Sequence, residues 1–427
     1  MSVAPHPGPR RSPARAALAL AIVVAIFSVA AGAASANPRG GHDTARHAHS
    51  ADAGVALQWY DITDNTVKAA AFPEPVTQSR VWALSWLAAA RAAGHASDPG
   101  YRVAAFAQAL HDTLVAQVPS QQSSLDADLA STLAGVPDGS AKSAGIAAGK
   151  QQASALLAAR SGDGLDTASV DSPFTPPPPA PGVWQPTPPT YGATIRAGQG
   201  KAKSFLLARN DQFDPGPPPS LSSRTYRDAL AEVHAYGSET SAVRTPAQTD
   251  TAKFWEPAAN IQYVQVVRGA LADTNAPLQS AVRFVAAFHV VTTDAQIAIY
   301  NAKYKYLFWR PVTAIRTGSI DPDPNWTPLF ATPLHPEYPS GHGGYAGASE
   351  GVLTAFLGRR APGPISATSP SDPGSTHSYR DWSSITQEVI DARVWEGIHF
   401  RTSDDTGARL GEQVAGYELP RLRSLGL

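Results

Sequence analysis

Residues 336–345 read Pro-Glu-Tyr-Pro-Ser-Gly-His-Gly-Gly-Tyr, and they are the most informative segment of this 427-residue chain. Pro339 disfavours helix before it, and the chain then turns through glycine into an alanine- and glycine-rich helical segment. The first backbone N–H groups of such a helix are unpaired and attract anions. Ser340 adds a hydroxyl there and His342 a titratable ring, so the segment predicts an anion site at a helix start. A simple helix cap with an incidental histidine is the alternative.

Two cations precede this segment. Lys303 and Arg310 are seven residues apart in a stretch of helical periodicity from about Pro277 to Trp309. Seven residues return to within about 20° of the same helix face, so both side chains are expected to point one way. Pro311 is expected to end the helix. A basic surface face is the alternative.

A third group follows at Arg393 and His399. Six residues along one helix would place them about 240° apart, on nearly opposite faces. If Gly397 ends the helix in a left-handed cap, the chain can bring His399 back beside Arg393. Otherwise Arg393 is a surface residue and His399 a core histidine.

Together these groups suit a tetrahedral oxyanion. Lys303, Arg310 and Arg393 would neutralise it, and one histidine could bond the central atom while the other moves protons. The sequence has no cluster of carboxylates around them, so a hard divalent cation is not expected.

The three segments, Lys303-x6-Arg310-Pro311, Pro339-Ser340-Gly341-His342 and Arg393-x5-His399, resemble the signature of vanadium-dependent haloperoxidases. Type 2 phosphatidic acid phosphatases and bacterial acid phosphatases share this signature. Residues 308–316 and 182–189 also resemble secreted bacterial haloperoxidases. The resemblance implies an all-α fold of helical bundles with long proline-rich crossings.

The resemblance also implies roles. The equatorial oxygens of vanadate would be held by Lys303, Arg310, Arg393, Ser340 and Gly341, and His399 would bond vanadium. His342 would exchange protons with the bound peroxide. The peroxide then oxidises halide to hypohalous acid. In a phosphatase, with phosphate in place of vanadate, His399 would form a phosphohistidine and His342 would protonate the leaving group.

The chain departs from the family pattern at two positions. Ala392 stands where serine is common, and Ser403 stands where the family has the aspartate that orients its histidine. Asp404 is one residue later; either it reaches His399 after a small loop shift, or His399 is less basic here. His335, five residues before Ser340, resembles the histidine of algal bromoperoxidases and implies bromide or iodide rather than chloride. A turn-capping role is its alternative.

Composition and patterning give the organisation of the chain. Residues 53–172 are predicted to be an N-terminal helical region, 173–221 a proline-rich crossing, and 222–427 the C-terminal helical bundle with the site. With 34 basic and 35 acidic residues, the charge does not favour nucleic acid. The absence of cysteine excludes disulfides and thiolate metal sites.

The N-terminus predicts export. Arginines precede an apolar run from Ala16 to Ala31, and a small-residue cleavage site follows, so residues 1–36 are interpreted as a signal peptide. Sec and Tat export both stay open. Residues 37–52 are predicted to be a disordered leader, and no later stretch is judged able to insert stably in a membrane. The mature chain would contain neither cysteine nor methionine, the side chains that oxidants modify first, and this would suit a protein exposed to an oxidant.

Three functions remain open. The first is a secreted vanadate-dependent haloperoxidase acting on hydrogen peroxide and halide. The second is a secreted acid phosphatase acting on a phosphomonoester through His399, and the third is a non-enzymatic oxyanion-binding protein. The sequence leaves the organic substrate and the oligomeric state open.

Overall fold

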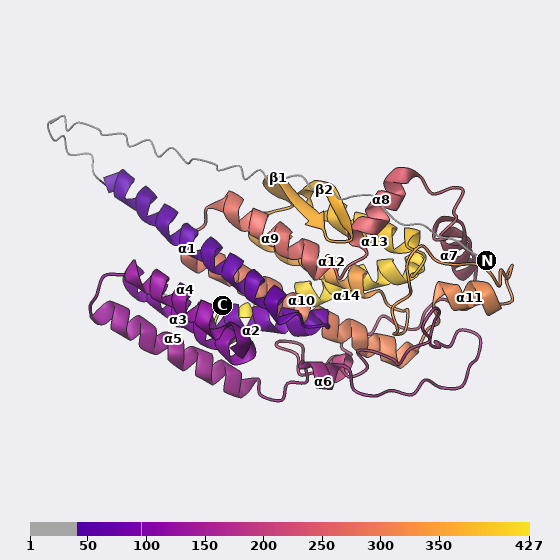
Figure 1. The fold of residues 1–427 in the computed structure, drawn as a ribbon, viewed down its shortest axis with the longest axis horizontal. Helices are drawn as coiled ribbons and strands as arrows, with labels where there is room; N and C mark the ends of the chain where they lie inside the picture. Colours follow the sequence, from indigo (N-terminus) through magenta and orange to yellow (C-terminus); the bar gives the residue numbers. More distant parts are fainter. Residues whose placement is uncertain (1–40, 95) are drawn as a thin grey trace, which may run out of the picture. The chain divides into compact units, whose positions relative to one another are not determined.

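The computed structural model describes residues 41–94 and 96–427 (Figure 1). The predicted signal peptide, residues 1–36, and the start of the predicted leader lie outside these residues. Helix α1 begins at Gly41, so residues 41–52 are helical where we predicted disorder. The helix is uninterrupted because residues 42–53 contain neither proline nor glycine. Residues 44–427 form a compact unit.

The N-terminal helical region contains six helices followed by a long irregular crossing. Their bounds are α1 Gly41–Ala70, α2 Pro75–Ala93, α3 Pro99–Gln117, α4 Gln122–Ala134, α5 Ser140–Ala159 and the short α6 Thr167–Val170. The crossing contains one 3₁₀ turn, η2 Gln199–Lys201, and another, η1 Pro119–Gln121, precedes α4. Proline at the first position of α2 and α3 supplies a preset backbone angle where no N–H is needed.

The C-terminal part holds the remaining helices and one β-hairpin. The elements are α7 Arg224–Tyr236, α8 Pro246–Trp255, α9 Asn260–Thr274, α10 Leu278–Tyr306, α11 Pro311–Thr317, α12 Gly341–Leu357, β1 Arg360–Ser369, β2 Asp372–Asp381, α13 Trp382–Trp395, α14 Arg401–Glu418 and η3 Leu419–Leu425. The predicted all-α class is confirmed, and the antiparallel β1–β2 pair is an addition that we did not predict.

Helix α10 is the central helix of the hydrophobic core. It packs against α2, α12 and α14 (Figure 1). One cluster of buried apolar residues extends from α1 through α10 to α14. Among the described residues α10 alone has the length and composition of a membrane span, which our sequence analysis overlooked. Since 94% of that window is buried in protein, these properties are those of a core helix.

Helices α12 and α14 touch backbone to backbone through glycines. A Cβ added to Gly347 would lie 2.1 Å from the carbonyl oxygen of Ala408, and one added to Gly411 would lie 2.1 Å from that of Gly344. Only glycine permits this approach. The contact places the start of α12 directly against α14, and so brings the second signature segment beside the third.

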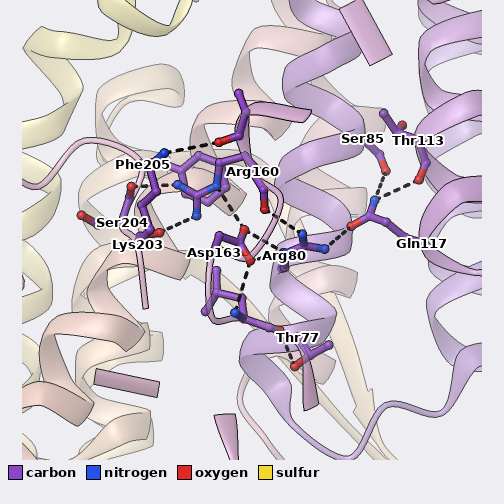
Figure 2. A network of polar contacts seen from close by, with 12 residues as sticks. Thr77, Arg80, Ser85, Thr113, Gln117, Arg160, Asp163, Lys203, Ser204 and Phe205 are labelled. Atoms are coloured by element: carbon purple, nitrogen blue, oxygen red, sulfur yellow. Dashed lines mark hydrogen bonds and ion pairs between the residues drawn. The ribbon is translucent and has the colours of Figure 1, made fainter. Parts of the chain in front are cut away.

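A buried polar network fixes the end of α5 and the later part of the crossing (Figure 2). Asp163 accepts hydrogen bonds from Arg80 Nε at 2.9 Å and from Arg160 Nε at 3.1 Å. Arg160 also donates to the carbonyl oxygens of Lys203 and Ser204. Because Arg80 belongs to α2, the network ties residues 203–204 to the N-terminal helices.

Candidate active site

Lys303 lies in the last turn of α10 and is fully buried. Its Nζ donates hydrogen bonds to the carbonyl oxygens of Pro336, at 2.9 Å, and Glu337, at 2.8 Å. One basic group thus holds the segment that leads into α12. An ammonium has three donors, so one remains for a ligand.

Arg310 is not on the same helix as Lys303, contrary to our prediction. Helix α10 ends at Tyr306, and Leu307 adopts a left-handed conformation with φ +49°. Arg310 is the N-cap residue of α11, and Pro311 begins that helix instead of ending the previous one. The two cations therefore meet through a turn, not through helical periodicity.

The guanidinium of Arg310 joins the other two signature segments. Its Nε donates to the carbonyl oxygen of His335 at 3.0 Å, and its NH1 donates to that of Ile398 at 2.9 Å. NH1 also lies 3.2 Å from Nε2 of His399. Burial lowers the pKa of Arg310 to about 10, so it stays charged at neutral pH.

The helix start predicted at residues 340–342 is confirmed. Ser340 is the N-cap of α12, and its hydroxyl oxygen accepts the backbone N–H of Gly343 at 3.3 Å. His342 Nε2 lies 2.8 Å from the carbonyl oxygen of Pro257. A carbonyl can only accept, so Nε2 carries the proton and Nδ1 is the basic nitrogen.

The predicted turn after Arg393 is also confirmed. Helix α13 ends at Trp395, and Gly397 has φ +81°. Arg393 NH1 donates to the carbonyl oxygen of Trp255 and to Oε1 of Glu396, each at 2.7 Å. Glu396, fully buried, is a partner that we did not predict.

Glu337, and not Asp404, is the carboxylate beside His399. Nδ1 of His399 lies 2.8 Å from Glu337 Oε1, which also accepts the backbone N–H of Phe400 at 3.0 Å. Glu337 Oε2 accepts the Ser403 hydroxyl at 2.5 Å. Ser403, which stands where the family has an orienting aspartate, therefore contacts Glu337, the carboxylate that orients His399 here. Glu337 was not among the predicted site residues, although its position three residues before Ser340 was a usable signal.

Asp404 lies on the other side of this group, near Ser340. It is fully buried, and burial raises the pKa of its carboxyl well above the ordinary value. The expectation that Asp404 reaches His399 is wrong, since Glu337 occupies Nδ1.

Both histidines of the signature are electrically neutral at neutral pH. Burial, with the charges of Arg310, Lys303 and Arg393, holds the pKa of His399 well below its ordinary value. Burial and Arg393 do the same for the pKa of His342. With Nδ1 of His399 directed at a carboxylate, its unprotonated Nε2 faces Arg310.

A cavity of about 160 Å³ borders these groups. Its walls include Gly341, His342, Arg393 and His399. The buried Nε of Arg393 has no hydrogen-bond partner within the described part of the chain. A buried unpaired donor is costly, and an anionic ligand at this wall would satisfy it. His335 also lines the cavity, with its Nε2 3.2 Å from the Tyr300 hydroxyl.

Comparisons with known proteins agree with this architecture. Residues 283–425 match the family model described as the VCPO second helical-bundle domain. Over 196 residues the chain is 29% identical to the vanadium chloroperoxidase of Curvularia inaequalis; the match spans 38% of this chain and 31% of that enzyme.

Two solved structures share the fold over most of the chain. The structure of the first bacterial vanadium-dependent iodoperoxidase superposes on this chain with a TM-score of 0.73 and 23% sequence identity. The match covers 85% of this chain and 96% of the iodoperoxidase chain. A holo bacterial vanadium-dependent chloroperoxidase gives 0.66 at 19% identity, covering 84% and 94%. The predicted resemblance to vanadium haloperoxidases is thereby confirmed.

Proposed function

We propose that this chain is a secreted vanadate-dependent haloperoxidase that uses hydrogen peroxide to oxidise halide, bromide or iodide rather than chloride, to hypohalous acid. Its fold and matched relatives support an enzyme of the vanadium haloperoxidase type with vanadate as cofactor. The observation that carries the proposal is the neutral His399, whose Nδ1 is bonded to Glu337 and whose unprotonated Nε2 lies 3.2 Å from Arg310 NH1.

The donor set fits a tetrahedral oxyanion. Lys303, Arg310 and Arg393 supply positive charge, and the unpartnered Nε of Arg393 is a donor in need of an acceptor. The start of α12 adds the N–H of Gly341 and the hydroxyl of Ser340. In this assignment these residues would hold the oxygens of vanadate, and His399 Nε2 would bond the metal. Bound vanadate would supply a centre that makes peroxide electrophilic toward halide without changing its own oxidation state.

His342 is suited to accept the proton of hydrogen peroxide. Its Nε2–H is held by the carbonyl oxygen of Pro257, so Nδ1 is the nitrogen available as base. Because its pKa lies well below the ordinary value, the ring is unprotonated at neutral pH.

The size of the cavity restricts the substrates. About 160 Å³ is close to the ~150 Å³ cavity that takes one benzene molecule, and well below the ~300–1,000 Å³ of pockets for larger ligands. Peroxide and a halide ion fit this space. We therefore assign halogenation of organic compounds to hypohalous acid that has left the site.

A phosphatase working through a phosphohistidine at His399 is the second candidate, because the same cations and the same unprotonated Nε2 suit phosphate. That reaction needs a protonated His342 to release the alcohol. We place the haloperoxidase first because the matched relatives are vanadium haloperoxidases.

The deciding experiment assays bromination of a phenol dye with bromide and peroxide, with and without orthovanadate, beside hydrolysis of an aryl phosphate. We expect vanadate-dependent bromination that is inhibited by phosphate and lost in His399→Ala. The control is His234→Ala, which should keep the activity; His234 is half-exposed, and its Nε2 lies 4.0 Å from Asp323 Oδ2. Hydrolysis blocked by vanadate, without bromination, would identify a phosphatase. Inactivity in both assays would leave only oxyanion binding.

Secretion is a separate part of the proposal. It rests on the signal-peptide pattern of residues 1–36. Expression with the native N-terminus in a bacterial host, followed by N-terminal sequencing of the exported protein, tests it. A start at Asn37 is expected, and retention of the intact N-terminus in the cytoplasm would contradict it.

A further inference from the structure

Beside Arg393, the wall of the cavity has a second arginine, which the signature does not include. Arg196 comes from the irregular crossing before η2 and lines the same cavity as His342, Arg393 and His399. Its positive charge contributes to the lowered pKa of His342, which places it within electrostatic range of the site.

The guanidinium of Arg196 is only partly used. Within the described residues its side chain forms one hydrogen bond, from NH1 to the Tyr300 hydroxyl at 3.1 Å. No carboxylate of the described chain forms an ion pair with it, whereas Arg393 is paired with Glu396. A guanidinium has five N–H donors, so most of them are available to a ligand.

The backbone holds Arg196 in a demanding conformation. Its φ is +61°, in the left-handed region that non-glycine residues rarely adopt. The backbone N–H of Arg196 donates to Asp171 Oδ1 at 2.6 Å, and Gly198 N–H donates to the carbonyl oxygen of Val170. The network at Asp163 and Arg160 then fastens the chain at residues 203–204 (Figure 2). The loop is thus anchored at the strained arginine and after it.

Tyr300 connects Arg196 to the oxyanion cradle. A Cβ added to Gly341 would lie 4.0 Å from the Tyr300 hydroxyl oxygen, which receives the hydrogen bond from Arg196. The same hydroxyl lies 3.2 Å from His335 Nε2. Arg196 therefore stands next to the cradle, with one tyrosine between them.

We infer that Arg196 forms a halide subsite beside the oxyanion cradle and sets the affinity for halide in the proposed reaction. One part of this inference rests on the proposed function, namely that the bound anion is a substrate of the enzyme. A guanidinium is weakly hydrated, and the neighbouring cavity wall includes Pro75, Ala258 and Pro333. One such cation beside apolar groups suits a large, weakly hydrated monoanion, namely bromide or iodide. A multiply charged oxyanion is better suited to the cradle, which has several cations, than to Arg196.

The variant Arg196→Gly makes the test sharp. Glycine adopts φ +61° without strain, so the guanidinium is removed while the loop keeps its backbone. Arg196→Lys keeps the charge but loses the planar donor array. Arg209→Gln is the control, because Arg209 is an exposed arginine that pairs with Asp211.

The first measurement is line broadening of ⁸¹Br in bromide solutions containing the protein saturated with orthovanadate, so that bromide cannot occupy the cradle. We expect broadening with the wild-type protein and with Arg209→Gln, and its loss in Arg196→Gly. Equal broadening in all three proteins would overturn the subsite.

The second measurement is steady-state bromination. In Arg196→Gly the KM for bromide is expected to rise about tenfold, the loss of one charge-assisted contact, while the KM for peroxide is unchanged. An unchanged KM for bromide in an active variant would overturn the inference. If the wild-type protein shows no bromination but the ⁸¹Br line broadening still depends on Arg196, the proposed function is wrong and the anion subsite stands.

Discussion

Glu337 and His399 form a hydrogen bond of 2.8 Å between Oε1 and Nδ1, although 62 residues separate them in the chain. The bond joins the segment before α12 to the turn after α13. It fixes the orientation of the His399 ring and leaves Nε2 unprotonated beside Arg310 NH1, which is the role of a carboxylate behind a ligating histidine.

Replacing Glu337 by alanine is therefore expected to weaken vanadate binding and bromination by about 10–100-fold, because the ring loses its orienting acceptor. Glu337→Ala/Ser403→Asp should recover part of both, since Ser403 already contacts Glu337 at 2.5 Å. Vanadate titration of each variant checks this, with the exposed Glu239→Gln as control. Full affinity in Glu337→Ala would exclude the role.

The contact between α12 and α14 predicts opposite effects for two glycines. Gly347→Ala would place a Cβ 2.1 Å from a backbone oxygen, so we expect a loss of about 1–3 kcal/mol in the free energy of unfolding. Gly416 is an exposed residue in α14 with no heavy atom within 4 Å of an added Cβ. There, alanine is expected to stabilise by about 0.5–1 kcal/mol. Urea denaturation measures both, and equal changes would contradict the packing argument.

The fold class and the second and third signature segments could be predicted because they depend on local rules: a serine N-cap at Ser340 and a left-handed glycine at Gly397. The Lys303–Arg310 pair was assigned for the wrong reason, since one left-handed residue, Leu307, ended the helix early. A single non-glycine residue in that conformation leaves no mark in hydrophobic periodicity. Glu337 could not be paired with His399 from sequence, because their contact depends on how α12 and α14 pack.

A buried carboxyl pair predicts a pH dependence of stability. Glu418 of α14 faces Asp294 of α10, which accepts the backbone N–H groups of Phe205 and Leu206 at 2.8 Å. Burial, and then the charge of Asp294, raise the pKa of Glu418 well above 4.5. A raised carboxyl pKa gives stability that is complete below the unfolded value and is lost as pH rises through the folded value.

Glu418→Gln mimics the protonated carboxyl at every pH. Relative to the wild-type protein, this variant should gain melting temperature as the pH is raised from 4.5 toward alkaline values. Asp211→Asn, at an exposed ion pair, should show no such trend. A difference that is constant with pH, or that shrinks as pH rises, would mean that Glu418 is ionised in the folded protein.

Asp163 is expected to be the most sensitive position of the network in Figure 2. Asp163→Ala leaves Arg80 and Arg160 without their shared carboxylate, and removing one partner of a buried charge group costs about 3–5 kcal/mol. Arg80 and Arg160 retain their other acceptors, Gln117 and the carbonyls of residues 203–204, so the lower end of that range is expected. Urea unfolding of this variant beside Asp211→Asn makes the comparison.

An oxyanion should stabilise the protein by relieving repulsion among its buried cations. Burial, and then the charge of Arg310, lower the pKa of Lys303, so in the absence of an anion the two cations disfavour each other. Orthovanadate at about 100 times its dissociation constant should add about 2.7 kcal/mol to the free energy of unfolding, and phosphate should compete for the site. Arg393→Ala is expected to abolish most of this gain, because it removes the unpartnered Nε donor together with one charge. Thermal unfolding over a vanadate series measures the effect, and an equal gain in Arg393→Ala would place the anion elsewhere.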